Sequence, residues 1–513
     1  MPQELNLVLP PQVAFDQTAL KGFLEKKTGS NDFTVRILRR SVDARKPEIK
    51  INLTVQILFP GEETDVTEPF RIKNVSHSGE VLIAGSGPAG LFAALALIEA
   101  GLKPVILERG REVRERKRDV AIISRQHIVD PDSNYCFGEG GAGTFSDGKL
   151  YTRSKKRGDN RRVLELLVQH GADPAILYEA HPHLGTDRLP GIITAIRNTI
   201  REAGGEVLFG KRITGIAVSN GKFREVTVNG NETYRAGDLI LATGHSARDI
   251  HSMLAGAGVR LAFKPFAMGV RVEHPQELID RIQYHGRSRG SFLPAAAYSL
   301  VTQADGRGVY SFCMCPGGFM VPSATAPGEV VVNGMSPSNR NSRWANSGIV
   351  TEIREEDAMR YGSGPLAGTA YQAALEKLAW KEGGMTQQAP AQRLTDFVEG
   401  KASSTLPEGS YFPGLTASPL HEWLPADISG RLRQGFREFG KKMRGFITGE
   451  ALVAAVESRT SSPVRILRDP VALNAEGIEG LWPAGEGAGY AGGIVSSAVD
   501  GMLLAQAIVR SSK

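Results

Sequence analysis

Residues 81–110, VLIAGSGPAGLFAALALIEAGLKPVILERG, decide the fold of this chain. The stretch begins with an apolar run that suits a buried parallel strand, turns through Gly85, Gly87 and Gly90, and continues as an apolar helix. In such a turn the first glycine permits the tight bend, the second lets the backbone approach a pyrophosphate, and the third lets the helix pack closely on the strand. The phosphates would then lie at the positive N-terminus of the helix.

A second strand, 104–107, ends in an acidic residue at about the 20-residue spacing that places a carboxylate at a ribose. Because strand, glycines, helix, second strand and acid all agree, the stretch predicts a dinucleotide site. The alternative is a glycine-rich turn that serves only packing. The residues expected at this part of the site are Gly85, Ser86, Gly87, Pro88, Ala89, Gly90, Glu108 and Arg109.

At 513 residues the chain is too long for one simple core, and we expect two or three domains. Its 41% hydrophobic and 23% charged residues are typical of a globular protein. Neither a signal peptide nor a membrane span is indicated, since the apolar stretch 81–102 belongs to the glycine motif. Three cysteines cannot form a disulfide framework, so we expect a cytoplasmic protein.

The net charge of +6 is spread along the chain, with acidic residues between the basic ones. Even the densest basic run, 109–118, contains Glu112 and Glu115, which favours a solvated helix face over a nucleic-acid surface. Alternatively, its arginines meet an anionic second cofactor. We therefore expect no nucleic-acid partner and no membrane insertion, and nothing in the sequence indicates an oligomeric state.

The first 76 residues are interpreted as a module of their own. Strand-like runs near 8–9, 35–38 and 50–59 accompany a helix, 16–27, in a ferredoxin-like β-α-β pattern. Several charges gather in 39–45, at a strand end. They indicate either a salt-bridged loop or a docking surface for the dinucleotide domain or a partner.

A glycine-rich segment, 134–149, follows the dinucleotide unit. So many glycines with Ser, Thr and Asn favour a loop whose backbone lies against a ligand over a flexible turn. Cys136 in this loop is expected to be structural, and His181 and His183 further along have no nearby carboxylate or cysteine, so no metal site is expected. The cofactor residues expected in the loop are Gly140, Gly141, Gly143 and Thr144.

A helix, 191–203, leads to short strands joined by Asn220-Gly221 and Asn229-Gly230, dipeptides typical of type I′ hairpin turns. The apolar run 238–242 then ends in Thr-Gly, and we expect it to return beside the first strand of the glycine motif. The cofactor residues expected in this part are Ile213, Thr243 and Gly244.

From about 257 to 440, strand-like runs separated by turns indicate a mostly antiparallel substrate domain with helices near 366–381 and 428–439. No second GxGxxG motif occurs, so a separate nicotinamide-binding domain is not expected. Strands are expected at 266–273, 298–303, 309–315, 319–324 and 329–333, and the asparagine-rich stretch 339–346 is expected to be a loop.

The last segment is expected to return to the first domain. Residues 480–493 again indicate a strand and a glycine turn, and a small-residue helix, 494–509, follows. The positive N-terminus of this helix would face the negative charge of a reduced flavin, unless it is only a capped core helix. Glu486 is expected at the ribityl or pyrophosphate part of the cofactor. The cofactor residues expected here are Gly485, Glu486, Gly493 and Ile494.

The predicted fold class is α/β. A Rossmann-like FAD-binding domain is assembled from two separated segments, 77–256 and 441–513. A mixed, β-rich substrate domain, 257–440, is inserted between them, and a small ferredoxin-like α+β domain, 1–76, precedes them.

Several strings of the chain together resemble one family over nearly its whole length. The chain is similar to the bacterial FAD-dependent, or NAD(FAD)-utilizing, dehydrogenases, flavoproteins of the glutathione-reductase-2 type with two dinucleotide-binding domains. This resemblance implies bound FAD and leaves NADH or NADPH open as a transient electron donor. The strings that carry it are GSGPAGLFAAL, ERG, FGEGGAGTFSDGKL, GVRVEHP (269–275), FCMCPGG (312–318), VNGMS (332–336), ESRTSSPVRI (457–466) and PAGEGAGYAGGI (483–494).

Hydride transfer at a flavin needs a site that excludes water and is lined by a few fixed polar groups. The arginines of the family-like strings would bind an anionic substrate, and a carboxylate or histidine would move a proton, unless these groups form structural ion pairs. The candidate catalytic residues are Arg271, Glu273, His274, Glu457 and Arg459. Cys313 and Cys315 are either a redox-active dithiol or, as we expect, buried free thiols.

Three classes of function remain open. We expect an FAD-dependent oxidoreductase, a dehydrogenase or reductase that acts on a small organic substrate. A flavin-dependent RNA-modifying enzyme would need a continuous basic surface. A non-enzymatic binding protein on the same fold, as in the Rab dissociation inhibitors, would be expected to have eroded cofactor motifs, whereas they are intact here.

Overall fold

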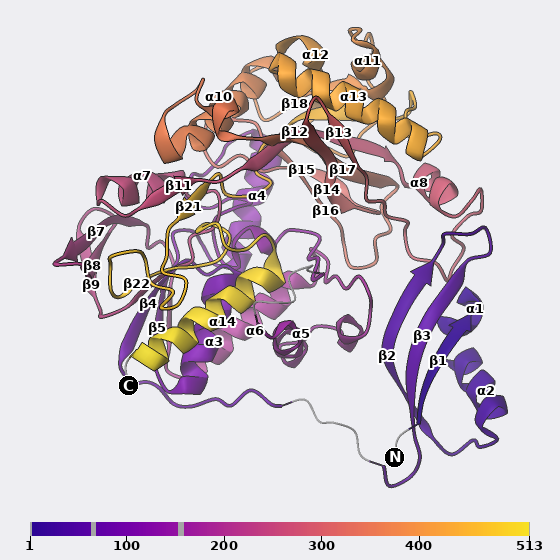
Figure 1. Ribbon diagram of the computed structural model, residues 1–513, viewed down its shortest axis with the longest axis horizontal. Coiled ribbons are helices and arrows are strands. Elements are labelled where there is room, and N and C mark those ends of the chain that lie inside the picture. The colour runs from indigo at the N-terminus through magenta and orange to yellow at the C-terminus, as the bar shows by residue number, and fades with distance from the viewer. Residues whose placement is uncertain (1–2, 63–67, 152–157, 512–513) are drawn as a thin grey trace.

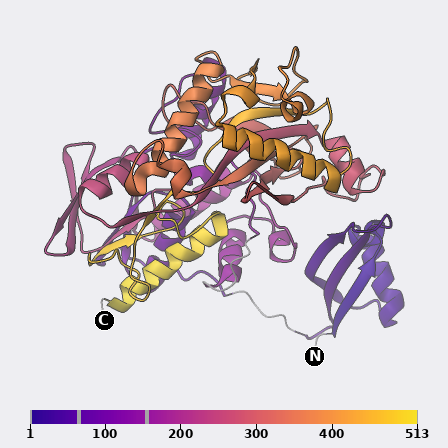
Figure 2. The same cartoon turned by 45° about the horizontal axis from the view of Figure 1, so that its top comes forward.

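The computed structural model describes residues 3–62, 68–151 and 158–511. Residues 63–67, which belong to the expected 1–76 module, lie outside these ranges. Figure 1 shows a small N-terminal sheet with its helices, a parallel sheet with helices beside it, and a larger sheet covered by helices. Figure 2 gives a second view in which the N-terminal sheet again stands apart from the rest.

The N-terminal part is a three-stranded antiparallel sheet with two helices. Its elements are β1 (Gln3–Leu9), α1 (Pro11–Ala14), α2 (Gln17–Thr28), β2 (Thr34–Asp43) and β3 (Lys50–Leu58). The strand order β1-β3-β2 places β3 between two parallel strands, which is the order of the first half of a ferredoxin-like fold. Asp16 caps α2 by accepting from the N–H of Ala19 at 2.8 Å, and Leu20 and Leu24 pack the helix on the sheet.

Strand β2 joins this sheet to the rest of the chain. The N–H of Arg40 donates to the carbonyl of Tyr178, and the N–H of Ala180 donates to the carbonyl of Arg40, both at 2.9 Å. Arg40 also donates through Nε to Glu179 at 2.8 Å. Segment 39–45 is therefore mainly strand, and its Arg40 docks on the dinucleotide part of the chain, whereas Asp43 and Arg45 make a local ion pair.

The parallel sheet contains five strands in the order β22-β10-β4-β5-β6. The expected return of the chain beside the first strand is confirmed, because β10 pairs with β4 on one side and with β22 on the other. The strands are β4 (Glu80–Ala84), β5 (Lys103–Leu107), β6 (Glu206–Leu208), β10 (Leu239–Leu241) and β22 (Leu481–Pro483).

Side chains alternate between the two faces of this sheet, as the pleat requires. Ile83, Ile106 and Ile240 pack under the helices α3 (Pro88–Ala100), α6 (Leu189–Glu202) and α14 (Ile494–Ser511). Leu82 and Leu239 pack on the other face, against the hairpins β7 (Ile213–Ser219), β8 (Lys222–Val228) and β9 (Glu232–Arg235) and the helix α7 (Arg248–Gly256).

Both hairpin turns are of the expected kind, since Asn220, Gly221, Asn229 and Gly230 all have positive φ.

Helix α14 is long and apolar enough to cross a membrane by length and composition, the one such helix among the described residues. More than half of it, 56%, is buried inside the protein, and its residues pack against α3 in the core beneath the parallel sheet. The same burial pattern is typical of a core helix of a globular protein.

The larger sheet has seven strands in the order β13-β14-β17-β12-β20-β18-β19, antiparallel except for the last pair. Helix α13 (Ala426–Lys442) covers it, with α10 (Ala367–Glu382) nearby (Figure 1). The strands are β12 (Phe266–Pro275), β13 (Val301–Ala304), β14 (Arg307–Cys315), β17 (Trp344–Ile353), β18 (Ala389–Arg393), β19 (Leu415–Ala417) and β20 (Leu452–Glu457).

Two features of this sheet differ from the expectation. The interior strand β17 begins at Trp344, inside the stretch 339–346 that was expected to be a loop. Its residues are buried on both faces, so the polar Asn346 and Ser347 lack the alternation that identifies a half-exposed strand. Strand β20 pairs with β12 and β18, so the segment that returns to the parallel sheet begins after Glu457 and not at 441.

The remaining elements connect these layers. Two small antiparallel pairs join β15 (Phe319–Pro322) to β16 (Val332–Met335) and β11 (Leu261–Phe263) to β21 (Val464–Ile466). The other helices are α4 (Val113–Gln126), α5 (Asn160–Gln169), α8 (Gln276–Gln283), α9 (Glu355–Ala358), α11 (Leu394–Glu399) and α12 (Leu420–Trp423).

Candidate functional site

A cavity lies at the carboxyl ends of the parallel strands. One part of its wall comes from the turn between β4 and α3, from Glu108 after β5 and from Ile213 at the start of β7. Another part includes Cys313 of β14 and Asn333 of β16. Segments far apart in the sequence thus enclose one cavity, at the position where open α/β sheets bind their ligands.

The turn after β4 has no room for side chains. Gly85 has φ +100°, and a Cβ there would lie 2.5 Å from a carbonyl oxygen at the end of β10. A Cβ on Gly90 would lie 2.0 Å from the carbonyl oxygen of Gly85, so glycine lets α3 begin this close to β4. Residues 87–89 line the cavity, and no side chain caps α3. Its first N–H groups are therefore available to an anion such as a diphosphate.

Glu108 holds the glycine turn together. Both the N–H and the hydroxyl of Ser86 donate to its Oε2 at 2.8 Å. The N–H groups of Gly110 and Gly138 donate to its Oε1 at 2.9 and 3.0 Å. A carboxylate accepts about four hydrogen bonds, so a ribose hydroxyl at Glu108 would have to share an oxygen with these donors from the chain.

The glycine-rich loop is clamped by Arg116 of α4, which is fully buried. Its guanidinium donates to four backbone carbonyls between residues 134 and 139, at 2.7 to 3.2 Å, and to the hydroxyl of Thr144 at 3.0 Å. Burial lowers its pKa to about 10, so it stays charged at neutral pH.

The basic run 109–118 was expected to be a solvated helix face, and this is correct only in part. Arg118 is exposed, but Arg116 is internal, and Arg109 lies between Asp132 and Asp249 at 2.7 and 3.0 Å. Sequence reasoning missed the clamp, because a buried arginine in a run of exposed charges has no local signal.

The expected cofactor residues divide into two groups. Those in the cavity wall come from the glycine turn, the loop, the strand ends and the start of α14. They are Gly85, Gly87, Pro88, Ala89, Glu108, Arg109, Gly141, Gly143, Ile213, Thr243, Gly244, Glu486, Gly493 and Ile494. The others lie behind the wall and support it: Ser86, Gly90, Gly140, Thr144 and Gly485.

The expected catalytic residues do not form one group. Glu273 accepts hydrogen bonds from the N–H and the hydroxyl of Ser410, and burial raises its pKa to about 7. His274 lies 2.8 Å from the carbonyl of Phe446, and burial lowers its pKa to about 4. Neither residue lines the cavity, so their expected position at the reacting atoms is wrong.

Arg271 and Glu457 form a buried ion pair, with 2.6 Å between Nη1 and Oε2. Arg271 also donates to Asn346 Oδ1 and to the carbonyl of Cys313, both at 2.8 Å. The pKa of Arg271 is raised by Glu457 against the effect of burial. These two residues therefore lie behind the cavity wall and support it, as the structural alternative predicts.

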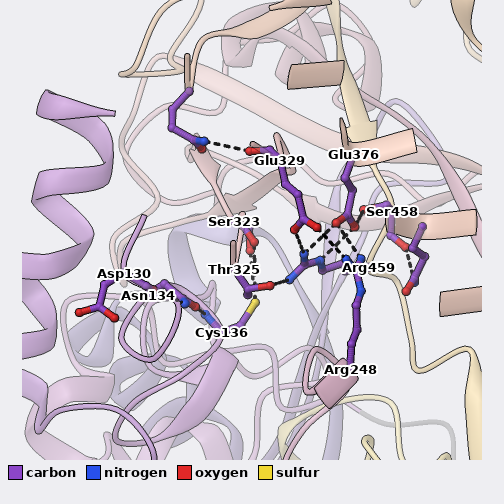
Figure 3. Close-up of polar contacts among 12 residues, drawn as sticks. Asp130, Asn134, Cys136, Arg248, Ser323, Thr325, Glu329, Glu376, Ser458 and Arg459 are labelled. Atoms are coloured by element: carbon purple, nitrogen blue, oxygen red, sulfur yellow. Dashed lines mark hydrogen bonds and ion pairs between the residues drawn. The ribbon is translucent and has the colours of Figure 1, made fainter. Parts of the chain in front are cut away.

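Arg459 lines the cavity, but its guanidinium is already bound (Figure 3). It donates to Glu376 at 2.8 and 3.1 Å and lies 3.2 Å from Glu329. Arg248 reaches the same two carboxylates at 2.7 and 3.1 Å. Two cations and two carboxylates form a neutral buried cluster, so Arg459 is part of the wall rather than a free anion receptor.

His245 and Glu486 form a second polar pair at the cavity, with 3.7 Å between Nδ1 and Oε2. Burial raises the pKa of Glu486 to about 7, with Lys264 opposing it. Burial, with Arg459 and Arg248 nearby, lowers the pKa of His245 to about 4. At neutral pH His245 is neutral and Glu486 is close to its midpoint, so the pair is able to accept or release a proton.

The polar residues of this wall that sequence reasoning missed include His245, Asn333 and Lys211. His245 directly follows the Thr-Gly just after β10, and its position beyond a parallel strand was a usable signal. Asn333 lies inside the family-like string VNGMS, but nothing local indicates that β16 faces the cavity. Of the two histidines considered for a metal, His183 lies 2.9 Å from the backbone carbonyl oxygen of Ser338.

Protein-family profiles match three parts of the chain. A profile described as FAD-dependent protein, C-terminal domain-like, matches residues 265–460. A profile described as FAD binding domain matches residues 78–126, which contain the glycine turn and Glu108. A domain of unknown function matches residues 1–58.

One curated relative and several solved structures are similar to the chain. An uncharacterized protein of Clostridium beijerinckii is 42% identical over 496 residues, which cover 92% of each chain. The structure of CtdE in complex with FAD and substrate 4 is 13% identical, with a TM-score of 0.34, over 85% of this chain and 82% of that one. The halogenase PltM is 13% identical, with a TM-score of 0.36, over 85% and 70%. A variant of E. coli quinol fumarate reductase FrdA is 14% identical, with a TM-score of 0.37, over 85% and 71%.

Proposed function

Because this chain belongs to the same protein family as the C. beijerinckii protein, a flavoprotein family, we propose that it is an FAD-dependent oxidoreductase that transfers a hydride between the flavin and an organic substrate. FAD is its cofactor. The observation that supports the proposal best is the joint cavity wall: Cys313 and Asn333 line the same cavity as the glycine turn of the FAD-binding domain. A substrate held against them would lie beside the cofactor.

The residues present fit the cofactor. The uncapped N-terminus of α3 suits the diphosphate, and Glu108 lies at the end of β5 where a ribose is bound in this fold. Gly493 and Ile494 place the N-terminus of α14 at the cavity, where its positive end favours a negatively charged ring. Bound FAD would supply two-electron redox chemistry there.

The chain's own groups would orient the substrate and handle its proton. The pair His245 and Glu486 would hold or release one proton near pH 7, since the pKa of Glu486 is about 7. The neutral cluster around Arg459 would keep the wall rigid and dry. Asn333 would donate or accept a hydrogen bond to the substrate from the larger sheet.

We extend the proposal to the type of enzyme, its electron donor, its location and its partners. The protein would be a dehydrogenase or reductase of the glutathione-reductase-2 type, act on a small organic substrate and take electrons transiently from NADH or NADPH. Three free cysteines in the described residues support a cytoplasmic location. Basic residues paired with acidic ones, such as Arg109 with Asp132, support the absence of nucleic acid and membrane as partners.

The test begins with the visible spectrum of the purified full-length protein, followed by anaerobic addition of NADH or NADPH. We expect a flavin spectrum that bleaches with one of the two nucleotides. A spectrum without flavin would refute the cofactor. If the bound flavin is reduced by neither nucleotide nor by any organic substrate, the proposed oxidoreductase function is refuted. Salt-sensitive RNA binding would then favour the RNA-modifying alternative.

A matched pair of variants tests the proton role of Glu486. The rate of flavin reduction is expected to change with an apparent pKa near 7 in the wild-type protein, and Glu486→Gln is expected to remove this step. Glu479→Gln, at an exposed ion pair with Lys222, is the control and should keep it. A step that persists in Glu486→Gln would assign the proton to another group.

A further inference from the structure

Cys313 and Cys315 lie at an irregular place in strand β14. The pairing of β14 with β17 is regular up to Phe312 and resumes only at Cys315, and Cys313 has φ +44°. The residue in this bulge has a left-handed backbone conformation, which changes the direction of its side chain relative to a regular strand. The strand expected at 309–315 is therefore present, but it has a bulge at Cys313.

The bulge brings both sulfurs to one ammonium group. Nζ of Lys149 lies 3.8 Å from Sγ of Cys313 and 3.8 Å from Sγ of Cys315. The Cys315 thiol also donates to the carbonyl oxygen of Cys313 at 3.3 Å. Both sulfurs therefore lie within 3.8 Å of the same ammonium nitrogen.

The two sulfurs differ in their access to the cavity. Cys313 is half-buried and lines the FAD cavity together with Asn333 and Thr460. Cys315 is buried behind it, 3.7 Å from Nη2 of Arg271. The thiol of Cys313 would therefore contact a bound cofactor, and the thiol of Cys315 lies in the interior behind it.

The charges around the sulfurs do not cancel. Lys149, Arg271 and Arg340 carry three positive charges, while Asp147 and Glu457 carry two negative charges when ionised. Asp147 lies 3.5 Å from Lys149 and 2.8 Å from Arg340, and Glu457 lies 2.6 Å from Arg271. This leaves at least one positive charge in excess, because burial raises the pKa of Glu457 to about 7, and a thiolate would offset it.

The pKa values follow this arrangement. The pKa of Cys313 is well below its ordinary value because of the hydrogen bond from Cys315 and the nearby Lys149 and Arg271. The pKa of Cys315 is well above its ordinary value because of the same hydrogen bond and because of burial. One thiolate and one thiol is the state that a dithiol needs in order to give up two electrons.

We infer that Cys313 and Cys315 are a redox-active pair that exchanges two electrons with the flavin and cycles between a disulfide and a dithiol. The inference rests on the proposed function only in requiring FAD in this cavity. In the reducing direction the S–S bond breaks, two electrons and one proton pass from the anionic reduced flavin, and the flavin becomes oxidised. Cys313 is left as the thiolate beside Lys149, and Cys315 takes the proton.

Anaerobic titration of the FAD-loaded protein with dithionite tests the pair directly. The oxidised protein is expected to take up four electrons per FAD, two for the flavin and two for the disulfide. Cys315→Ser and Cys313→Ser are expected to take up two. Cys136→Ser, which removes the third cysteine, is the matched control and should keep four.

Mass spectrometry gives a second readout that needs no activity. Trypsin places both cysteines in one peptide, 308–340, and Cys136 in another, 126–149. After treatment of the wild-type holoprotein with diamide, the first peptide should weigh two hydrogens less and resist alkylation until it is reduced. This measurement shows whether the two cysteines form a disulfide even if the serine variants fail to fold.

The outcomes separate this inference from the proposed function. Two electrons per FAD in the wild-type protein, with both thiols of peptide 308–340 still alkylated after diamide, would overturn the redox pair and leave the flavin oxidoreductase intact. Four electrons per FAD, in a protein that no nicotinamide nucleotide or organic substrate reduces, would support the pair and contradict the proposed function.

Discussion

Replacing Arg116 by methionine tests whether the buried arginine holds the glycine-rich loop in its FAD-binding form. Methionine keeps most of the side-chain volume and the helix propensity of α4, but it removes every hydrogen-bond donor. Four carbonyls between 134 and 139 and the hydroxyl of Thr144 then lose their charged partner. The loop that lines the cavity through Gly141 and Gly143 is expected to loosen.

The size of the effect follows from these contacts. Hydrogen bonds to a charged group contribute about 1.5–3 kcal/mol each, but they are not additive, and water entering the loop would recover part of the loss. Breaking a buried charged network by removing one member costs about 3–5 kcal/mol. If ordering the loop around FAD costs about 3 kcal/mol more in the variant than in the wild-type protein, the dissociation constant for FAD rises by about 150-fold.

The assay is a titration of apoprotein with FAD, followed by the quenching of flavin fluorescence, at a temperature where circular dichroism shows both variants folded. Arg118→Met on the exposed face of the same helix is the control, and its affinity should equal that of the wild-type protein within about twofold. The reasoning is refuted if folded Arg116→Met binds FAD as tightly as Arg118→Met does.

Three further predictions test other parts of the argument. Gly90→Ala is expected to abolish bound flavin absorbance, because its Cβ would lie 2.0 Å from a backbone oxygen, whereas Gly191→Ala has no atom within 4 Å of its Cβ and should keep the flavin. The pKa of Glu273 is about 7 in the folded protein against an ordinary value of 4.5, so the folded state binds more protons between these values. The free energy of unfolding should therefore fall as the pH rises from 4.5 to 7 and stay level above, and in urea titrations Glu273→Gln should remove about 3 kcal/mol of this fall. Arg459→Met should lower the free energy of unfolding by about 3–5 kcal/mol. The double variant with Glu376→Gln should lose less unfolding free energy than the two single variants lose together, because either change already breaks their ion pair. Strictly additive losses would contradict the cluster.

Local requirements explain what could be predicted from the sequence. Gly85 and Gly90 have no room for a side chain because strand and helix meet within a few residues of each other in the chain. The turns at 220–221 and 229–230 were recognisable because type I′ turns need positive φ at both central residues. The sequence therefore determined the dinucleotide unit and the hairpins, and most of the residues that it predicted for the cofactor line the cavity.

Strands of the larger sheet were harder to identify. Strand β17 is buried on both faces and contains Asn346 and Ser347, so its polar residues resemble those of a loop. Its hydrogen-bonding partners β12 and β14 come from elsewhere in the chain, and only the assembled sheet brings Arg271 to the Oδ1 of Asn346 and the carbonyl of Phe312 to the hydroxyl of Ser347. For the same reason β20 belongs to this sheet although the segment after it returns to the parallel one.

The tertiary structure alone decided which charged groups serve the cavity. Arg116, Lys149 and Arg271 are charged residues in unremarkable local sequence, and their roles depend on carbonyls, sulfurs and carboxylates that lie far away along the chain. A buried charge is tolerated only where several distant segments supply its partners, and such a set has no period or spacing. The sequence by itself therefore determined the glycine turn at which we propose that FAD binds, and the folding of distant segments against one another determined what lies beside it.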